Sequence, residues 1–278
     1  MIVPASGDDV RTIGRRRKVD ETTLRLTLML GERGTAWAAR DDGDVVGVVV
    51  ACDTQEERYV GDLFVEPSFR NQGIGVALLE AAFANDERDR AMLVNPDDPA
   101  ALTLAIRFGM AAREPLIRFA GAMPKEEELA KMAAGDYRFE VAPIDAATHA
   151  FALDELDRRT RGTTRPADHA AWTNGANGYA FFLNGEFVAY AYVWPDGRVG
   201  PLAASSPAYL VQILGYALAA LSRTYGASWC TLLVPCVNRR VARAALRAGL
   251  RMEETLLFAA DAFLGEMSTY IGYHPLIL

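Results

Sequence analysis

LFVEPSFRNQGIG, residues 63–75, is the stretch that decides the fold of this chain. Its first three residues end a run typical of a β-strand, and the apolar spacing after Gly73 is that of a helix. A strand therefore runs through a short turn directly into a helix. Gly73 and Gly75 stand at the helix entrance, where each glycine costs about 1 kcal/mol relative to alanine. Two residues that disfavour a helix at a helix entrance indicate that the glycines serve a function there.

The predicted reason is a binding site for an anion, with an ordinary tight turn as the alternative. Backbone N–H groups at a helix start point outward with the positive end of the helix dipole behind them. Without side chains at Gly73 and Gly75, a phosphate could approach this backbone closely, and Arg70 adds a positive charge. Other glycine motifs do not fit. Leu78 stands where a dinucleotide-binding fold would need a third glycine, and the chain has no G-K-[ST] for a P-loop.

Outward from this stretch, the order of elements occurs twice along the chain. Asp42-Gly43 and Asn184-Gly185 each lie between two strand-like runs and predict a hairpin. Each hairpin is followed by strand, helix, strand and a second helix that ends at Gly109 or Gly249. A last strand is then expected to close each copy, Leu116–Ala120 in the first and Met252–Ala259 in the second. The distance from hairpin glycine to final glycine is 66 residues in the first copy and 64 in the second. This near-match favours an internal duplication over a coincidence of alternating strands and helices.

With these residues in view, the first half resembles the GCN5-related N-acetyltransferase (GNAT) superfamily, whose signature [RQ]-x-x-G-x-[GA] matches Arg70–Gly75. The resemblance implies an α/β (α+β) fold with two GNAT-like domains, each a mixed, mostly antiparallel central sheet flanked by helices. It also implies binding of acetyl-CoA as acyl donor, and no metal. The residues it assigns to the cofactor are Phe64 and Val65, for the pantetheine, and Arg70, Asn71, Gln72, Gly73, Ile74 and Gly75, for the pyrophosphate.

The second half resembles a degenerate GNAT copy. We expect a GNAT domain over residues 1–121, a linker over 122–136 and the degenerate domain over 137–278. The signature position of the second copy reads Ala203-Ala204-Ser205-Ser206-Pro207. A serine cap and a proline in the first helical position would satisfy that helix start internally. We therefore expect strong coenzyme A binding only in the first half.

The resemblance further implies an acyl-CoA-dependent N-acyltransferase that moves an acetyl group directly to an amine of a small molecule or peptide. Asp62 is the predicted general base, with a solvated or turn carboxylate as the alternative reading. Many family members use a tyrosine as general acid at the position of Ala105, so Tyr59, or a tyrosine of the second half, would have to substitute. A non-catalytic acyl-CoA-binding sensor or an adaptor is the alternative function.

Composition narrows the classes further. Hydrophobic residues make up 51% and charged residues 23%, as in an ordinary globular chain, and no apolar run reaches membrane-spanning length. The net charge of −7 argues against a nucleic-acid partner. The chain has three cysteines without C-x-x-C spacing, and its start has no secretory signal. We therefore expect a cytoplasmic protein. For the basic run Arg15–Lys18 we expect a solvated helix end, with an anion-binding or targeting role as the alternative. A homodimer and the identity of the amine acceptor stay open.

Overall fold

The computed structural model describes residues 1–262 and 265–278, which form two compact units. Unit 1 comprises Met1–Ala112, Phe258–Ala262 and Pro275–Ile277. Unit 2 comprises Arg113–Leu257 together with residues 265–274 and Leu278. The units thus depart from the predicted ranges. The predicted linker 122–136 belongs to unit 2, and two segments near the end of the chain belong to unit 1.

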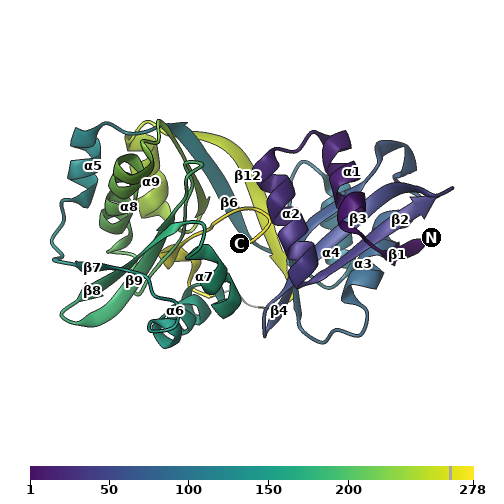
Figure 1. Cartoon of the computed structure of the whole chain (residues 1–278), viewed down its shortest axis with the longest axis horizontal. Coiled ribbons are helices and arrows are strands. Elements are labelled where there is room, and N and C mark those ends of the chain that lie inside the picture. Colours follow the sequence, from purple (N-terminus) through teal and green to yellow (C-terminus); the bar gives the residue numbers. More distant parts are fainter. Residues whose placement is uncertain (263–264) are drawn as a thin grey trace. The chain divides into compact units, whose positions relative to one another are not determined.

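Unit 1 alternates strands and helices around one sheet (Figure 1). Side-chain caps start three of its helices, since Ser6, Asp20 and Asp98 each accept from a backbone N–H of the first turn. The elements are β1 (Ile2–Pro4), α1 (Gly7–Arg17), α2 (Glu21–Arg33), β2 (Thr35–Asp41), β3 (Asp44–Asp53), β4 (Glu57–Val65), a 3-10 turn (Pro67–Phe69), α3 (Ile74–Phe83), β5 (Asp89–Val94) and α4 (Pro99–Arg107).

The sheet of unit 1 has the order β1-β2-β3-β4-β5, antiparallel except for the parallel pair β4–β5. Helices cover both of its faces. On one face Ile13 of α1 packs with Val48 and Phe64. On the other face a Cβ at Gly47 would meet Leu78 of α3 at 3.3 Å, so glycine lets α3 lie close to β3. This arrangement confirms the predicted mixed, mostly antiparallel sheet flanked by helices.

Both predicted hairpins are present. The turn between β2 and β3 has φ 46° at Asp42 and 91° at Gly43, and the turn between the second copy's strands has 54° at Asn184 and 81° at Gly185. Positive φ at both central residues matches the right-handed twist of the flanking strands, and Asn-Gly or Asp-Gly tolerates it best. The hairpins are therefore confirmed by the conformation that their sequence predicts.

The last strand of each copy departs from the expected arrangement. Leu116–Ala120 was expected to close the first copy, but residues 116–122 of β6 (Ala111–Ala122) pair antiparallel with β11 (Trp229–Pro235) in unit 2. Residues 258–262, at the end of β12 (Arg251–Ala260) and beyond it, belong instead to unit 1. There the Asp261 carboxylate accepts from the Arg90 amide at 2.8 Å. Each unit is thus completed by a strand segment from the other half of the sequence.

Unit 2 has a five-stranded antiparallel sheet in the order β13-β10-β9-β8-β7. A second group of strands, β6 and β11, with β12 beside β6, completes it. Its remaining elements are α5 (Glu126–Ala133), β7 (Glu140–Pro143), α6 (Ala150–Arg161), α7 (Pro166–Trp172), β8 (Asn177–Leu183), β9 (Glu186–Val193), β10 (Val199–Ala204), α8 (Leu210–Tyr225), α9 (Arg239–Arg247), a 3-10 turn (Met267–Thr269) and β13 (Tyr270–Ile271).

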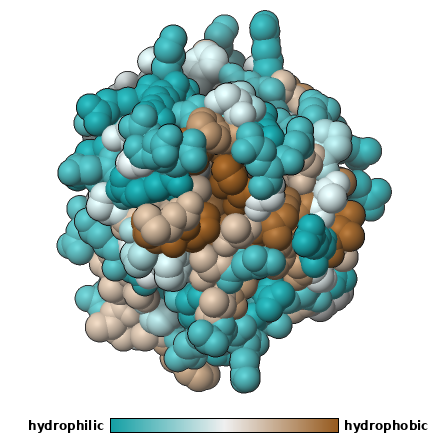
Figure 2. Space-filling view, turned by 90° about the vertical axis from the view of Figure 1, so that its right-hand side faces the viewer, coloured by the Kyte–Doolittle hydropathy of each residue, from teal (hydrophilic) through white to brown (hydrophobic). Residues whose placement is uncertain are grey.

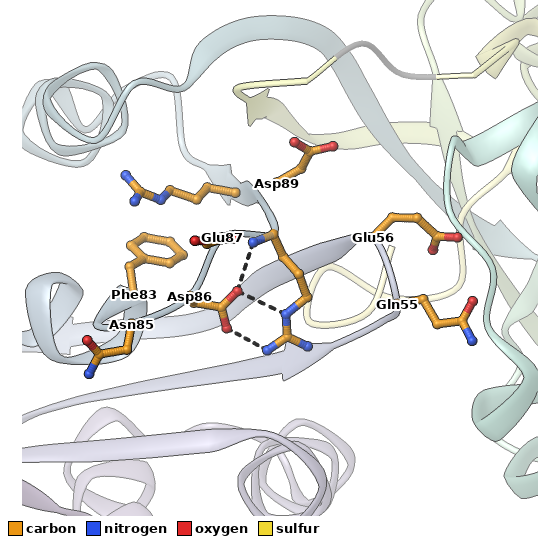
Figure 3. A pocket seen from close by; sticks show the side chains of 9 residues that line it. Gln55, Glu56, Phe83, Asn85, Asp86, Glu87 and Asp89 are labelled. Atoms are coloured by element: carbon orange, nitrogen blue, oxygen red, sulfur yellow. Dashed lines mark hydrogen bonds and ion pairs between the residues drawn. The ribbon is translucent and has the colours of Figure 1, made fainter.

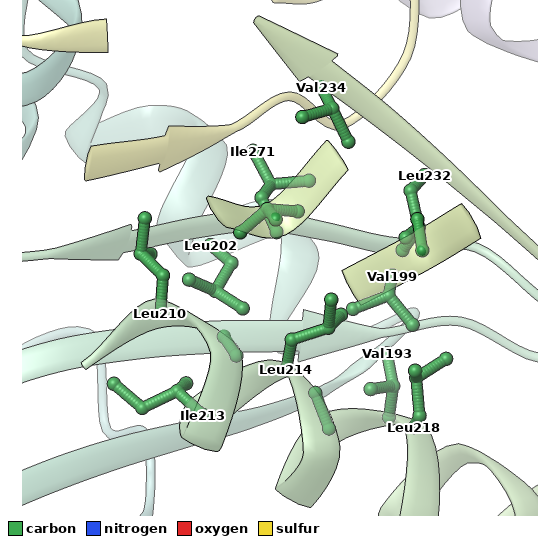
Figure 4. Close-up of a cluster of buried hydrophobic side chains, with 14 of the residues drawn as sticks. Val193, Val199, Leu202, Leu210, Ile213, Leu214, Leu218, Leu232, Val234 and Ile271 are labelled. Atoms are coloured by element: carbon green, nitrogen blue, oxygen red, sulfur yellow. The ribbon is translucent and has the colours of Figure 1, made fainter. Parts of the chain in front are cut away.

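The core of unit 2 forms around α8, whose apolar face meets β-branched and leucine side chains of the strands (Figure 4). Leu210, Ile213 and Leu214 are fully buried there. Helix α5, part of the predicted linker, packs against α8 because Gly215 leaves room for it. A Cβ at Gly215 would lie 2.5 Å from the Ala133 backbone nitrogen. The segment between the copies is therefore part of the unit 2 core. Within the described residues, no helix has the length and apolar character for crossing a membrane.

A buried network of polar side chains fixes α6 and α7 in unit 2. The Asp157 carboxylate is fully buried and accepts from Arg165 Nη2 at 2.9 Å and from the Tyr190 hydroxyl. His169 Nε2 lies 2.8 Å from the same carboxylate, and His169 Nδ1 lies 2.9 Å from the Tyr192 hydroxyl. His169 is therefore held inside this network by both of its ring nitrogens. Buried charges of this kind are tolerated because each is paired and hydrogen-bonded.

Replacing Asp157 by Asn is predicted to destabilise unit 2 by about 3–5 kcal/mol, because Arg165 would stay buried without a counter-charge. Urea unfolding followed by tryptophan fluorescence in a Trp37→Phe background reports on unit 2, where the other three tryptophans lie. The control is Glu127→Gln, whose side chain is 80% exposed in its pair with Lys131, and which should change stability by less than about 0.5 kcal/mol. Equal losses in the two variants would contradict the assigned role.

The contribution of Asp157 is also predicted to depend on pH. Burial by itself would raise the pKa of Asp157, but the charge of Arg165 and the hydrogen bond from His169 outweigh it and hold the pKa well below the ordinary 3.8. A carboxyl whose pKa is depressed by folding stabilises the folded state above its unfolded pKa and loses this effect in acid. The stability difference between wild type and Asp157→Asn should therefore be full above pH about 4 and shrink below it. A constant difference down to pH about 2 would contradict this.

Candidate functional site

The two parallel strands of unit 1 pair over only part of their length. The register of β4 with β5 runs from Glu57–Asp89 to Val60–Met92. Strand β4 then continues to Val65 and β5 to Val94. The strands are thus held together at their starts and part toward their carboxyl ends. An opening between neighbouring strands exposes backbone N–H and C=O groups that an extended ligand can pair with.

A bulge marks the place where the strands part. The register of β3 with β4 passes from Val50–Asp62 to Ala51–Val60, which leaves Gly61 as an extra residue in β4. A Cβ at Gly61 would lie 2.7 Å from the Leu276 carbonyl oxygen and 2.9 Å from Leu30 Cδ1, so glycine is required here. Bulges bend the strand that carries them and re-aim the residues that follow. The second half of β4 is therefore directed by this bulge.

The backbone of Val65 faces the opening. The Glu66 amide donates to the Val46 carbonyl at 2.9 Å, and hydrogen-bonded pairs in an antiparallel ladder alternate along the strand. Phe64 therefore bonds to Val48 of β3, whereas the polar backbone groups of Val65 and Leu63 point the other way. Arg70 Nε donates to the Val65 carbonyl at 3.2 Å from that side. Of the two residues predicted to pair with the pantetheine, Val65 directs its backbone amide into the opening, whereas Phe64 directs its own toward β3. The alternation along the strand adds Leu63 to the residues that face the opening.

The signature turn leads from this strand end into α3. Asn71 has φ 61° and Gly73 has φ 82°, and Gly73 caps α3 with no side-chain hydrogen bond to the first turn. A Cβ at Gly73 would meet nothing within 4 Å. The turn thus holds a left-handed conformation that favours glycine, and the space beside Gly73, at the start of α3, is open. Arg70 is exposed beside it.

The second signature glycine, Gly75, also has a packing role. A Cβ at Gly75 would lie 3.2 Å from Leu104 Cδ1 of α4, so the missing side chain lets α3 pack close to α4. Gln72 donates to the Ser68 carbonyl at 3.3 Å and stabilises the turn. Gly73 and Ile74 also line a hollow of about 270 Å³ that reaches Ile2 of β1. Figure 2 views the chain from the side that carries β1 and shows apolar atoms in its middle, surrounded by polar ones.

Two arginines of the basic run at the end of α1 turn onto β4. Arg17 donates to both oxygens of Asp62, at 2.6 and 2.8 Å. Arg16 pairs with Glu66 at 3.3 Å and donates to the Val45 carbonyl at 2.7 Å. The solvated helix end that was one expectation for this run is therefore wrong for these two residues. Burial raises the pKa of the Asp62 carboxyl above its ordinary value, and the charge and hydrogen bonds of Arg17 oppose that rise.

Tyr59, the other predicted catalytic residue, has a structural partner. Its side chain is buried, its hydroxyl donates to the Pro275 carbonyl, and its ring stacks on Phe258 with centroids 6.2 Å apart. Among the described residues of unit 1 it is the only tyrosine. Ala105, where the family tyrosine would stand, is fully buried. Unit 1 therefore offers no tyrosine hydroxyl that is unengaged.

A larger hollow of about 930 Å³ lies at the opposite ends of β4 and β5, where the two strands are paired (Figure 3). Two of its lining side chains, Asp86 and Arg88, satisfy each other. The Asp86 carboxylate accepts from Arg88 Nε at 2.9 Å and pairs with Arg58 at 2.8 Å. The hydrogen bonds from Arg88 outweigh the effect of burial and lower the pKa of Asp86 to about 2. Within the described residues, no cluster of His, Cys, Asp or Glu could hold a metal ion.

In unit 2, the place that corresponds to the opening is filled by the chain itself. The Ser205 amide donates to the Val188 carbonyl at 2.8 Å, as Glu66 does to Val46 in unit 1, so Leu202 and Ala203 correspond to Leu63 and Phe64. Strand β13 pairs with these two residues through Ile271 and Tyr270. On its other side the Gly272 amide donates to the Leu233 carbonyl of β11 at 2.7 Å. An extended segment of this chain thus lies between the two strands.

The helix start of the second copy also differs from the prediction. A turn precedes α8, in which the Tyr209 amide donates to the Ser206 carbonyl at 3.2 Å. The helix begins at Leu210, with Tyr209 as its cap and no side-chain cap bond. The expected serine cap is present on this turn, where Ser206 Oγ accepts from the Ala208 amide at 3.3 Å, but α8 itself begins later and Pro207 lies outside it. Instead, the rings of Tyr137 and Phe139 pack on Tyr209 at 4.6 and 5.5 Å.

Comparison with known proteins agrees with this geometry. Residues 32–109 match the model of the acetyltransferase (GNAT) domain. A protein of Pyrococcus horikoshii assigned to the acetyltransferases is 15% identical, with a TM-score of 0.72 over 100% of this chain and 95% of that chain. A tandem GNAT protein from the clavulanic acid biosynthesis pathway is 16% identical, with a TM-score of 0.62 over 94% and 97%. A GCN5-related N-acetyltransferase of Sphaerobacter thermophilus is 15% identical, with a TM-score of 0.65 over 94% of each chain.

The solved structures show that the whole chain has the tandem GNAT fold. At 15–16% identity these structures show the fold of this chain and do not identify its substrate. Comparison with curated protein sequences finds no match.

The pairing of Arg17 with Asp62 yields a test that does not depend on function. In the variant Arg17→Ala, burial would act on Asp62 without an opposing charge, so the pKa of Asp62 is predicted to rise further. Carbon-13 NMR titration of the aspartate carboxyl groups measures it, and Arg25→Ala, an exposed arginine of α2, is the control. An unchanged Asp62 titration in Arg17→Ala would contradict the ion pair.

Proposed function

Since residues 32–109 match the acetyltransferase (GNAT) domain model, we propose that unit 1 is an N-acetyltransferase that binds acetyl-CoA and acetylates an amine of a small molecule or peptide. The observation that carries this proposal is the parting of β4 from β5 after Val60–Met92. It leaves the Val65 amide unpaired by β5, and the chain turns from this strand end into the entrance of α3. A pantetheine arm needs a free strand amide such as that of Val65, and a diphosphate needs a helix entrance such as that of α3.

In the proposed complex, the pantetheine amides pair with the edge of β4 at Leu63 and Val65, as an added strand would. The diphosphate binds to the first backbone amides of α3, where the turn through Gly73 leaves open space and the helix dipole favours an anion. Arg70, exposed beside the turn, supplies a positive charge. The Gln72 side chain holds the turn through Ser68, so it acts on the cofactor through the loop conformation.

The proposed reaction is a direct attack of a neutral amine on the thioester carbonyl. A lysine-type amine with a pKa of about 10.4 must lose a proton at pH 7 at a cost of about 4.6 kcal/mol, whereas an α-amine near 8 costs about 1.4 kcal/mol. The nitrogen–carbon bond forms, and the oxyanion that develops accepts a hydrogen bond from the Val65 amide. The carbon–sulfur bond then breaks and the thiolate of coenzyme A leaves.

Asp62 is the proposed base that receives the proton of the amine. Its burial raises its pKa, which makes it a better proton acceptor than an exposed carboxylate, and Arg17 holds it in place. No general acid is assigned, because the Tyr59 hydroxyl is bound to Pro275. A thiol with a pKa near 8.5 is a sufficient leaving group without one. The same lack of an acid favours the second candidate, a sensor that binds acyl-CoA without turnover.

The cofactor assignment predicts that Gly73→Asp lowers the affinity for coenzyme A by at least 100-fold, because the new carboxylate would project into the place of the diphosphate. Isothermal titration measures the affinity. The matched control is Gly43→Asp, which also has a positive φ with nothing within 4 Å of its Cβ. The control bears the same backbone strain at the hairpin turn and should bind normally. Equal affinity in both variants would remove the proposed phosphate site.

The reaction predicts thiol release from acetyl-CoA in the presence of a suitable amine. In Asp62→Asn, kcat/KM for a lysine-type amine at pH 7 should fall by about 10²–10⁴, with a smaller loss for an α-amine. Coenzyme A affinity should be retained, which shows that the variant is folded, and Asp62→Glu should restore part of the activity. Tight coenzyme A binding without thiol release across a broad amine panel would favour the sensor instead.

A further inference from the structure

Helix α9 of unit 2 carries a dense group of arginines on its exposed side. It packs on the core through Val241 and Ala245, both fully buried. The arginines that face solvent on this helix and just after it, named here the arginine face, are Arg239, Arg240, Arg243, Arg247 and Arg251. Residues three and four apart on a helix are neighbours, about 5–6 Å between Cβ atoms, so positions 240, 243 and 247 form one stripe.

The arginine face is without carboxylate partners in the part of the chain that the structure describes. None of its five side chains takes part in an ion pair or hydrogen bond with residues 1–262 or 265–278. Other arginines of the chain do pair. Arg58 and Arg88 bind Asp86, and Arg165 binds Asp157. In a chain with net charge −7, uncompensated positive charge is thus gathered on one helix.

This arrangement opposes the stability of α9. Like charges three or four residues apart repel on a helix surface. Arg239 and Arg240 also occupy the first turn, where the helix dipole favours acidic residues, and this first turn contains none. The buried contacts of α9 require none of these arginines. Because several neighbouring arginines of α9 oppose helix stability, we infer that they serve an interaction outside unit 2.

The first copy provides an internal comparison. Helix α4 has the same place in its copy, with Ala105 buried like Ala245 and Ile106 exposed like Leu246. Its only arginine is Arg107, which corresponds to Arg247. The positions of Arg239, Arg240 and Arg243 are Pro99, Ala100 and Thr103 in α4. The duplicated helix therefore folds without these charges, and they are particular to unit 2.

Exposed apolar side chains border the arginine face. Val237 is 47% exposed, Leu246 56% and Met252 57%. No Asp, Glu or Lys interrupts residues 239–252. Enrichment in Arg and Met with depletion of Lys, Glu and Asp is the composition of protein interfaces. We propose that the arginine face binds an acidic peptide segment of a partner protein, one that carries apolar residues between its carboxylates.

The chemistry of the two sides is complementary. Each guanidinium presents a planar fork that binds a carboxylate with two hydrogen bonds, and the apolar residues at the borders accept aliphatic side chains. A nucleic acid would use the charges but not these apolar residues, and the chain's net charge of −7 opposes its approach. This surface is independent of the proposed cofactor site, which lies in unit 1.

The test uses the full chain and a fluorescein-labelled peptide built on the repeat Glu-Glu-Leu, with fluorescence polarisation as the readout. The triple variant Arg240→Ala, Arg243→Ala, Arg247→Ala is expected to lose at least 10-fold in affinity. Alanine is the best helix former, so α9 should persist, and circular dichroism checks it. The matched control removes three exposed arginines elsewhere, Arg25→Ala, Arg107→Ala and Arg223→Ala, and should bind like wild type.

Two further arms decide the chemistry. The wild-type affinity should fall as salt is raised, and the same peptide with Gln in place of Glu should bind at least 10-fold more weakly. Equal loss in the α9 and control variants would overturn the proposal, because it would show a general charge effect. Tighter binding of a single-stranded DNA of equal charge, or a loss of self-association in the α9 variant with no peptide binding in wild type, would also overturn it.

Discussion

The structure of unit 1 depends on one constraint in its sheet, the end of pairing between β4 and β5 after Val60–Met92. Because β5 does not follow β4 further, the Val65 backbone keeps its polar groups directed into an opening. The bulge at Gly61 bends the strand at the same point and requires glycine there. The turn through Gly73 then places the start of α3 directly beyond the strand end. Together these features suit one kind of ligand. An extended ligand with an anionic end can pair with the strand edge and place its anion at the helix entrance that follows.

Unit 2 has the same arrangement of strands, but the opening between the two corresponding strands, β10 and β11, is filled. Its strand β10 has the edge that corresponds to Leu63–Val65, but β13 pairs with it and bridges to β11. The helix start is covered by the aromatic rings of Tyr137 and Phe139. A backbone segment that satisfies the strand edges removes the polar groups that a pantetheine would use. The duplicated unit therefore keeps its fold without the cofactor-type groove, and its exposed surfaces become the place to look for a second role.

Local features were predictable from the sequence, and long-range ones were not. The hairpin turns at Gly43 and Gly185 and the turn at Gly73 were predicted because each depends on a few neighbouring residues with positive φ. The Arg17–Asp62 pair joins residues 45 apart, and the bond from Tyr59 to Pro275 joins residues 216 apart. Sequence periodicity carries no information about such partners. The same limit explains why β6 was assigned to the wrong unit and why β13 in the second opening was missed, since a strand's composition does not name its neighbour.

A crystal structure of the full chain with coenzyme A would test the central claim most directly. We expect one bound molecule, with its pantetheine between β4 and β5 against the Val65 edge and its diphosphate on the amides that follow Gly73. The place between β10 and β11 would still be occupied by β13. A coenzyme A seated in unit 2, or in the hollow beside Arg88 while the space between β4 and β5 stays empty, would contradict the account.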